Sequence, residues 1–349
     1  MILPQTFGAA LFVLILGLLC LGSWPSAYKW AKLRWELSYF DFAAGVLAAA
    51  VIWGLTVGNL GFDGFSLMDD LIHAGKRQWF FAIVAGILFN FGNMLLMASV
   101  SVSGLSTAFP VAFAAAMILS TAIRMIGGPA GSSTLNLGGC LLLLLAIVLG
   151  AAAANIVVVM RHEANAKTGK TRSTRRPTAA KPVILAVAAG ILLGLHLPLV
   201  DRATVPDIGL GSYTLALLFS AGLALSTAVL SIFFINLPAE GEPAELSEYL
   251  KAGIGTHLRG LLSGGIWCTG ALALFISANT ADLLKEIPTI FHYLKNAAPL
   301  IVALWGWIAW KEFRETDIRA KSLAILMLVF FACGLLMLVL APLHPVMPT

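Results

Sequence analysis

Charged side chains are scarce in this chain of 349 residues. Aspartate, glutamate, lysine and arginine together make up 11% of it, whereas soluble domains average about 25%. Hydrophobic residues reach 59%, and the mean hydropathy is +0.92. A chain of this composition cannot keep most of its surface in water, which excludes a soluble globular protein.

Cysteine is also scarce, and its spacing excludes two kinds of site. The four cysteines, Cys20, Cys140, Cys268 and Cys333, all fall inside apolar stretches. They suggest neither a disulfide framework nor a paired-cysteine metal motif. We therefore expect no metal ion and no cofactor, and we interpret the cysteines as small apolar residues within helices.

Motifs for membrane-embedded catalysis are missing as well. The sequence has no HExxH motif and no paired acids within an apolar stretch, and its loops are too short to bind a lipid head group. Long loops or soluble domains, which a receptor or an assembly scaffold would add, are absent too. We therefore expect that the protein is not an enzyme.

What the sequence does contain is a series of apolar stretches. Each is roughly 17–26 residues long and can cross the ~30 Å hydrocarbon core of a bilayer as a helix. The first has no basic residue before it and no small-residue cleavage site after it, so we interpret it as a span and not as a signal peptide. The ten stretches cover residues 7–27, 40–60, 79–98, 104–126, 135–160, 182–200, 211–236, 258–278, 288–310 and 321–342. The sequence thus predicts an all-α integral membrane protein with ten transmembrane helices.

Basic residues predict the orientation of these helices. Most of the 22 lysine and arginine residues fall in alternate loops, which lie on one side of the membrane if the ten spans are correct. Basic loops mark the cytoplasmic side, so both termini are expected to be extracytoplasmic and the protein to reside in the plasma membrane, the inner membrane of a bacterial cell. The net charge of +5 then reflects topology and contact with membrane lipid, and not binding to nucleic acid.

The longest polar run, residues 162–181, contains a match to a nucleotide-binding loop from Ala164 to Thr171. A phosphate loop needs a strand before it and a helix after it, so that backbone N–H groups can surround the phosphate. No strand precedes this match, and a loop of about 20 residues has no room for a sheet. We therefore do not expect ATP binding, and we interpret residues 161–181 as a basic cytoplasmic linker.

This linker separates two segments, 1–160 and 182–349, with five predicted spans each. Because five is odd, the two segments begin on opposite sides of the membrane, and any homology between them would be an inverted repeat. Short similarities occur at matching positions, as between "GLLCLGSWP" (17–25) and "GILLGLHLP" (190–198). Two inverted five-helix repeats are typical of alternating-access carriers.

Three stretches resemble a known group of transporters. "ALWGWIAWKEF" (303–313), with the five-plus-five plan and the short fourth and ninth spans, resembles the drug/metabolite transporter superfamily. Within that superfamily, residues 16–51 and 85–114 are similar to the group of ureide permeases, glucose/ribose porters and the L-rhamnose–proton symporter. Ureide permeases are also described as having a phosphate-loop-like sequence in the central loop, which "AKTGKT" resembles. This resemblance implies transport of a small polar neutral solute, commonly coupled to protons.

Polar side chains in the ninth span are the first candidates for the binding site. Placing a lysine at the centre of a span costs about 2.5–3.5 kcal/mol, so its presence needs a reason. In a helix, His292, Lys295 and Asn296 would share one face. We expect Lys295 and Asn296 to bind the substrate, and the resemblance supports this because related sugar-nucleotide and phosphate carriers place an Asn-Lys pair or a basic pair on this helix. The alternative is that Lys295 extends to the membrane surface.

Two asparagines and two tryptophans complete the candidate binding residues. Asn90 and Asn93 share a face of the third span and either contact the substrate or tie helices together. Trp24 and Trp267 offer flat rings that can stack on a sugar or a planar ureide, although tryptophan also anchors helices at membrane interfaces.

Acidic residues deep inside a span, common in proton-driven carriers, are not apparent. Asp41 lies at the start of a span, Asp201 just past the end of one and Glu286 just before another. The groups inside spans that titrate near neutral pH are His196 and His292. Either one of these histidines binds the coupling proton, or the protein is a facilitator.

These features predict a secondary transporter that moves a sugar, such as rhamnose, glucose or ribose, or a ureide by alternating access, with proton coupling. The alternative is a drug or metabolite efflux permease of the same superfamily. Exporters of hydrophobic amines tend to have an acid within the membrane, so its apparent lack favours a polar solute.

Overall fold

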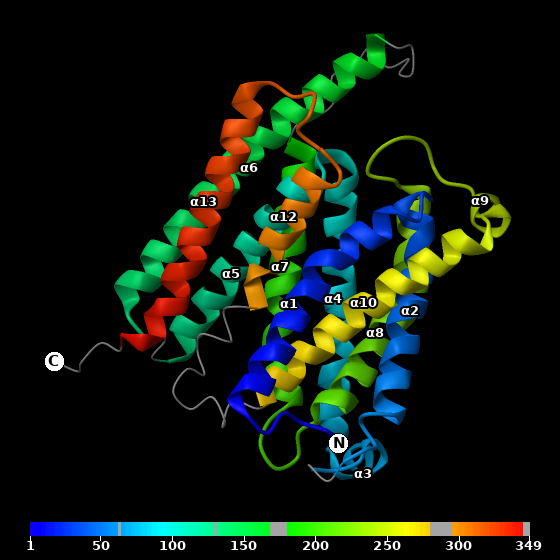
Figure 1. Cartoon of the computed structure of the whole chain (residues 1–349), viewed down its shortest axis with the longest axis vertical. Coiled ribbons are helices and arrows are strands. Elements are labelled where there is room, and N and C mark those ends of the chain that lie inside the picture. Colours follow the sequence, from blue (N-terminus) through cyan, green and yellow to red (C-terminus); the bar gives the residue numbers. More distant parts are fainter. Residues whose placement is uncertain (62–63, 129–130, 168–179, 280–294, 345–349) are drawn as a thin grey trace. The chain divides into compact units, whose positions relative to one another are not determined.

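The structure is a computed structural model that describes residues 1–61, 64–128, 131–167, 180–279 and 295–344. Within these ranges every regular element is a helix (Figure 1). Nine of the described helices are long and apolar enough to cross a membrane. The predicted all-helical membrane class is therefore confirmed.

The described helices follow the predicted spans closely. The helices that can span a membrane are α1 (Phe7–Lys29), α2 (Trp35–Leu55), α4 (Lys76–Ser103), α5 (Leu105–Gly127), α6 (Ser133–Lys167), α7 (Ala180–Ala203), α8 (Ser212–Asn236), α10 (Ile254–Asn279) and α13 (Ile318–Leu340). The shorter helices are α3 (Leu67–His73), α9 (Leu246–Lys251), η2 (Lys295–Ala297), α12 (Ala298–Ile308) and η3 (Ala341–Leu343).

Several helix boundaries differ from the predicted ones, among them the start of α2 and the end of α6. α2 begins at Trp35, before the predicted start at residue 40, because the less apolar residues of "WELSY" already form its first turns. α6 continues to Lys167, so residues 161–167 of the expected linker are helical. Alanine and glutamate in this stretch are strong helix formers, which favours the extension.

The ninth predicted span, 288–310, is described only in its second part. In that part the chain forms η2 and α12, whereas residues 280–294 lie outside the described ranges. The count of ten transmembrane helices and the inverted repeat therefore stay predictions.

The chain divides into two compact units, each built from two separate segments of the sequence. Unit 1 comprises Met1–Phe91 and Leu195–Ala298, and unit 2 comprises Gly92–Gly194 and Pro299–Thr349. Since the boundaries fall at residues 91 and 194, α4 and α7 each contribute one segment to each unit.

Glycines allow the helices of unit 1 to approach closely. α1 and α2 both pack along α10, and α2 also packs against α8 (Figure 1). A Cβ atom at Gly45 would collide with the backbone of Leu261, and one at Gly264 would collide with the backbone of Phe42. Small residues at such crossings are typical of helix packing in membranes.

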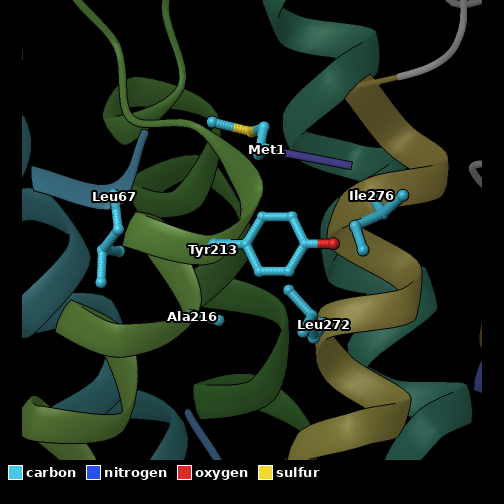
Figure 2. Packing of buried hydrophobic residues seen from close by; sticks show 6 residues of the cluster. All are labelled: Met1, Leu67, Tyr213, Ala216, Leu272 and Ile276. Carbon is cyan, nitrogen blue, oxygen red and sulfur yellow. The ribbon is translucent and has the colours of Figure 1, made fainter. Parts of the chain in front are cut away.

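One end of unit 1 has a hydrophobic core that includes the first residue of the chain. Its buried members are Met1, Leu67, Tyr213, Ala216, Leu272 and Ile276. Figure 2 shows the Tyr213 ring reaching from α8 toward Leu272 and Ile276 on α10. The Tyr213 hydroxyl donates a hydrogen bond to the carbonyl of Ile2 at 3.0 Å, which fixes the N-terminal residues against α8.

Unit 2 is built around α6, which packs along α13 and α5. One of its cores comprises Ala153, Val157, Phe313, Ala320 and Ala324. The small alanines let α6 and α13 approach closely, and Phe313 in the same core stacks on Trp307 with ring centroids 4.6 Å apart.

Candidate functional site

Aromatic rings gather inside unit 1, where α1, α2, α4, α8 and α10 each contribute a side chain. We call this group the aromatic cluster; it contains Trp24, Tyr28, Tyr39, Phe42, Phe89, Phe219 and Trp267. Their ring centroids lie at the separations typical of favourable aromatic pairs.

Trp24 and Trp267, the two tryptophans predicted to bind substrate, both belong to the aromatic cluster. The ring of Phe42 joins them, with centroids 4.8 Å from Trp24 and 6.2 Å from Trp267. Trp267 also meets Phe89 at 4.9 Å and stacks on Phe219 at 6.1 Å. Trp24 is 2% exposed and Trp267 5%, so neither side chain is a membrane-surface anchor.

His196, a predicted proton-coupling residue, lies at the edge of the aromatic cluster. Its ring meets Phe89 and Phe219 edge-on, at centroid distances of 5.4 Å and 6.0 Å. This position could not be predicted from the sequence, because α7 and α4 are far apart along the chain.

Asn90 makes hydrogen bonds to two other helices of unit 1. Its Oδ1 accepts from the Tyr39 hydroxyl at 2.9 Å, and its Nδ2 donates to the carbonyl of Leu223 at 3.1 Å. Nδ2 also lies 2.8 Å from Ser226 Oγ and 3.1 Å from Thr227 Oγ1. The side chain is fully buried, so its amide ties α4 to α2 and α8. A contact between Asn90 and substrate stays a prediction.

The remaining predicted binding residues lie elsewhere. Asn93 is buried and belongs to unit 2. Asn296 is half-buried in η2, which Lys295 begins and which lies beside α1. His292 lies outside the described residues. The prediction that His292, Lys295 and Asn296 share one helix face is therefore untested.

Asp41, in the second turn of α2, is a buried carboxylate that was not among the predicted site residues. Its Oδ2 lies 2.9 Å from His257 Nδ1 on α10, and its Oδ1 accepts a hydrogen bond of 2.7 Å from the Tyr249 hydroxyl on α9. The Asp41 side chain is 7% exposed and that of His257 25%. We call these three residues the Asp41 site.

α2 begins earlier than its apolar stretch, so Asp41 lies in the second turn of the helix and is buried there, although it is not deep within the span. Burial, then the hydrogen bond to Asp41 and its negative charge, raise the pKa of Tyr249. Tyr249 therefore remains a neutral donor at physiological pH. His257 was not a candidate either, because its partner is 216 residues away in the sequence.

Glu312 forms a second polar site, within unit 2. Its carboxylate accepts hydrogen bonds from the backbone N–H groups of Leu105 and Ser106, both at 2.9 Å, and from the Ser106 hydroxyl at 2.8 Å. The residue before α5 is Gly104, which has no side chain to cap the helix. Glu312 therefore supplies the cap, and its charge suits the positive end of the helix.

No group of three or more histidine, cysteine, aspartate or glutamate side chains that could hold a metal ion occurs among the described residues. The Asp41 site supplies only one carboxylate and one imidazole, and its third member is a tyrosine.

Apolar helices of spanning length, with polar side chains buried among them, define a multi-pass helical membrane protein. No family model matches the chain. It is similar to Ureide permease 1 of Arabidopsis thaliana, with 23% identity over 99% of this chain and 100% of that protein. Ureide permease 5 of the same plant is 23% identical over 95% of this chain and 94% of its own length. Ureide permease 2 is 29% identical over 30% of this chain and 28% of its own length.

The chain is therefore weakly homologous to ureide permeases along nearly its full length. The predicted resemblance to ureide permeases is confirmed at this level, and the chain is a permease-like membrane transport protein. Its place in the drug/metabolite transporter superfamily stays a prediction.

Proposed function

We propose that the protein is a secondary transporter that moves a small polar solute, a ureide or a sugar, across the plasma membrane by alternating access coupled to protons. The observation that carries this proposal is the similarity to ureide permeases over nearly the whole chain. The buried aromatic cluster supports it, because flat rings can stack on a planar ureide or on the C–H face of a sugar.

The aromatic cluster is the proposed centre of the binding site. Trp24 and Trp267 provide the stacking faces, while Asn90 and the Tyr39 hydroxyl place polar atoms beside the rings. Since both tryptophans are buried, a solute reaches them only when the surrounding helices separate. Opening of the helices to one side of the membrane at a time is the alternating-access cycle.

The polar residues predicted from the sequence complete this proposal. Lys295 and Asn296 are proposed to donate hydrogen bonds to the solute, while a solute contact of Asn93 and the proton-coupling roles of His196 and His292 stay predictions from the sequence. A polar solute pairs with such donors, whereas a hydrophobic compound would leave them unsatisfied at a cost of about 1–3 kcal/mol each. This difference favours a polar solute over the compounds that efflux permeases move.

Uptake into vesicles containing the purified protein tests the proposal. The panel comprises ureides, nucleobases and monosaccharides, each measured with and without an inward proton gradient. We expect saturable uptake of a ureide or a sugar that the gradient accelerates. Transport of lipophilic amines without uptake of any polar solute would instead identify an efflux permease.

A further inference from the structure

The Asp41 site joins three elements of unit 1 through one buried carboxylate. Asp41 is on α2, Tyr249 on α9 and His257 on α10. A Cβ atom at Gly260 would lie 2.5 Å from Asp41 Cβ, so α10 makes one of its closest approaches to α2 at this carboxylate. Any change in the strength of the Asp41–His257 interaction therefore acts directly on the contact between these helices.

Other titratable side chains lie near Asp41 besides His257 and Tyr249. Tyr28 on α1 interacts electrostatically with Asp41 and with two other side chains of α2, Glu36 and Tyr39. Glu36 pairs with Arg34 at 3.3 Å.

The other nearby elements add no ion-pairing partner that the structure shows for Asp41. Along α8 the sequence has no charged side chain, and its tyrosine, Tyr213, is at the start of the helix. On α10, Arg259 donates to the carbonyl of Trp30 at 3.4 Å. Histidine is the side chain that gains and loses a proton in the physiological range.

The Asp41 site is also connected to the aromatic cluster. Phe42, which joins Trp24 to Trp267, follows Asp41 directly in α2. Gly264, on the same helix as His257, packs against the Phe42 backbone. A shift of α10 relative to α2 at Asp41 would therefore change the contact between Phe42 and Trp267.

We infer that the Asp41–His257 pair binds the proton that is coupled to transport. This inference rests on the proposed transport function. In the proton-free form, the neutral ring of His257 donates its Nδ1–H to the Asp41 carboxylate, and Nε2 holds a lone pair. One proton from water then binds Nε2 and gives an imidazolium beside the carboxylate, which raises the charge of the pair by one.

The protonated pair makes a stronger, charge-assisted hydrogen bond, which holds α10 against α2. Release of the proton weakens this bond and lets the two helices separate beside the aromatic cluster. Proton binding and access to the cluster would then be linked, as coupled transport requires. His257 is a quarter exposed, so its ring can exchange protons with water, whereas Asp41 is enclosed.

Two transport measurements test this inference in reconstituted vesicles. Exchange of labelled for unlabelled solute at equal pH needs no net proton movement, whereas uphill accumulation needs the proton gradient. We expect Asp41→Asn and His257→Gln to keep exchange at the wild-type level and to lose accumulation by about tenfold or more. His73→Gln is the matched control, because His73 is exposed on α3 and should retain both activities.

Wild-type accumulation in both variants would overturn the inference, as would a folded His257→Gln protein that loses exchange and accumulation together. If Asp41→Asn fails to reach the membrane, His257→Gln decides alone. Infrared difference spectra between acidic and alkaline pH provide a readout without solute. We expect one imidazole band and one carboxylate band that change together in the wild type and are missing in His257→Gln, whereas the bands of the other five histidines remain in both spectra.

The infrared result also separates the two proposals. If the wild-type protein transports no solute of the panel and still shows these bands, the proposed function is refuted and proton binding at the Asp41 site is not. Transport without the bands refutes the proton site alone.

Discussion

The Tyr39 hydroxyl donates a hydrogen bond to Asn90 Oδ1 across 2.9 Å, and so joins α2 to α4 inside unit 1. The same amide donates to the carbonyl of Leu223 on α8. Three helices that surround the aromatic cluster are therefore held by one buried side chain. This arrangement gives Asn90 a positioning role that is separate from any contact with a solute.

Asn90→Leu is expected to destabilise the protein, because it leaves the Tyr39 hydroxyl without its acceptor in a buried environment. Such an unsatisfied group costs about 1–3 kcal/mol. Thermal unfolding in detergent measures the effect. Asn236→Leu is the control, since Asn236 is exposed at the end of α8, where its Nδ2 donates to the carbonyl of Ile232 in the same helix. Equal melting temperatures for the two variants would contradict the positioning role.

The helices could be predicted from the sequence because the membrane restricts backbone structure. A segment in hydrocarbon must satisfy its own hydrogen bonds, so an apolar stretch of sufficient length forms a helix. The fourth span was expected at 104–126, and α5 covers Leu105–Gly127. Trp24, Trp267 and His196 could also be selected, because such side chains within spans are unusual.

The pairing of residues across helices could not be predicted in the same way. Hydropathy gives the length of a helix and does not show which helix it contacts. Asp41 and His257 are brought together by the crossing of α2 and α10, which depends on glycines such as Gly260. Likewise, the hydrogen bonds of Asn90 depend on the packing of α4 against α8.

A change at Gly264 should disrupt the crossing of α2 and α10. In Gly264→Ala, the new methyl group meets the backbone of Phe42, which cannot rotate away. Overpacking of this kind costs about 1–3 kcal/mol, and we expect a lower melting temperature. Gly265→Ala provides a matched control in the adjacent position, because its nearest neighbour is Ala49 Cβ at 4.0 Å. Destabilisation by Gly265→Ala of the same size would show that helix packing is not the cause.

Glu312→Gln is expected to weaken the start of α5 while preserving the size of the side chain. A neutral amide has one oxygen to accept the bonds that two carboxylate oxygens now share, and it lacks the charge that suits the helix N-terminus. Hydrogen exchange at the Leu105 and Ser106 amides should therefore accelerate. The exposed Glu315 lies on the same connection, so Glu315→Gln should leave that exchange unchanged. Equal protection of these two amides from exchange in both variants would contradict the capping role of Glu312.

The predicted orientation can be checked with two glycines that have open space around them. No atom lies within 4 Å of a Cβ built at Gly127 or Gly253, so a cysteine fits at either position in a variant whose native cysteines are replaced. The positions of basic residues place residue 253 on the cytoplasmic side and residue 127 outside. An impermeant thiol reagent applied to intact cells should therefore label Gly127→Cys and leave Gly253→Cys unlabelled until the cells are opened. The reverse pattern would place both termini in the cytoplasm.

Substitutions of Trp267 should separate a role in packing from a role in solute binding. Trp267 contacts Phe42, Phe89 and Phe219, so Trp267→Ala would leave a cavity and destabilise the protein by about 3–5 kcal/mol. Trp267→Phe keeps a ring in the aromatic cluster and should preserve most of the stability. If the indole stacks on the solute, Trp267→Phe should still raise the KM for uptake several-fold, because a smaller ring covers less of the solute. Trp30 is 53% exposed, and Trp30→Phe should change neither property. An unchanged KM in stable Trp267→Phe protein would assign Trp267 to packing alone and would move the proposed stacking surface to Trp24.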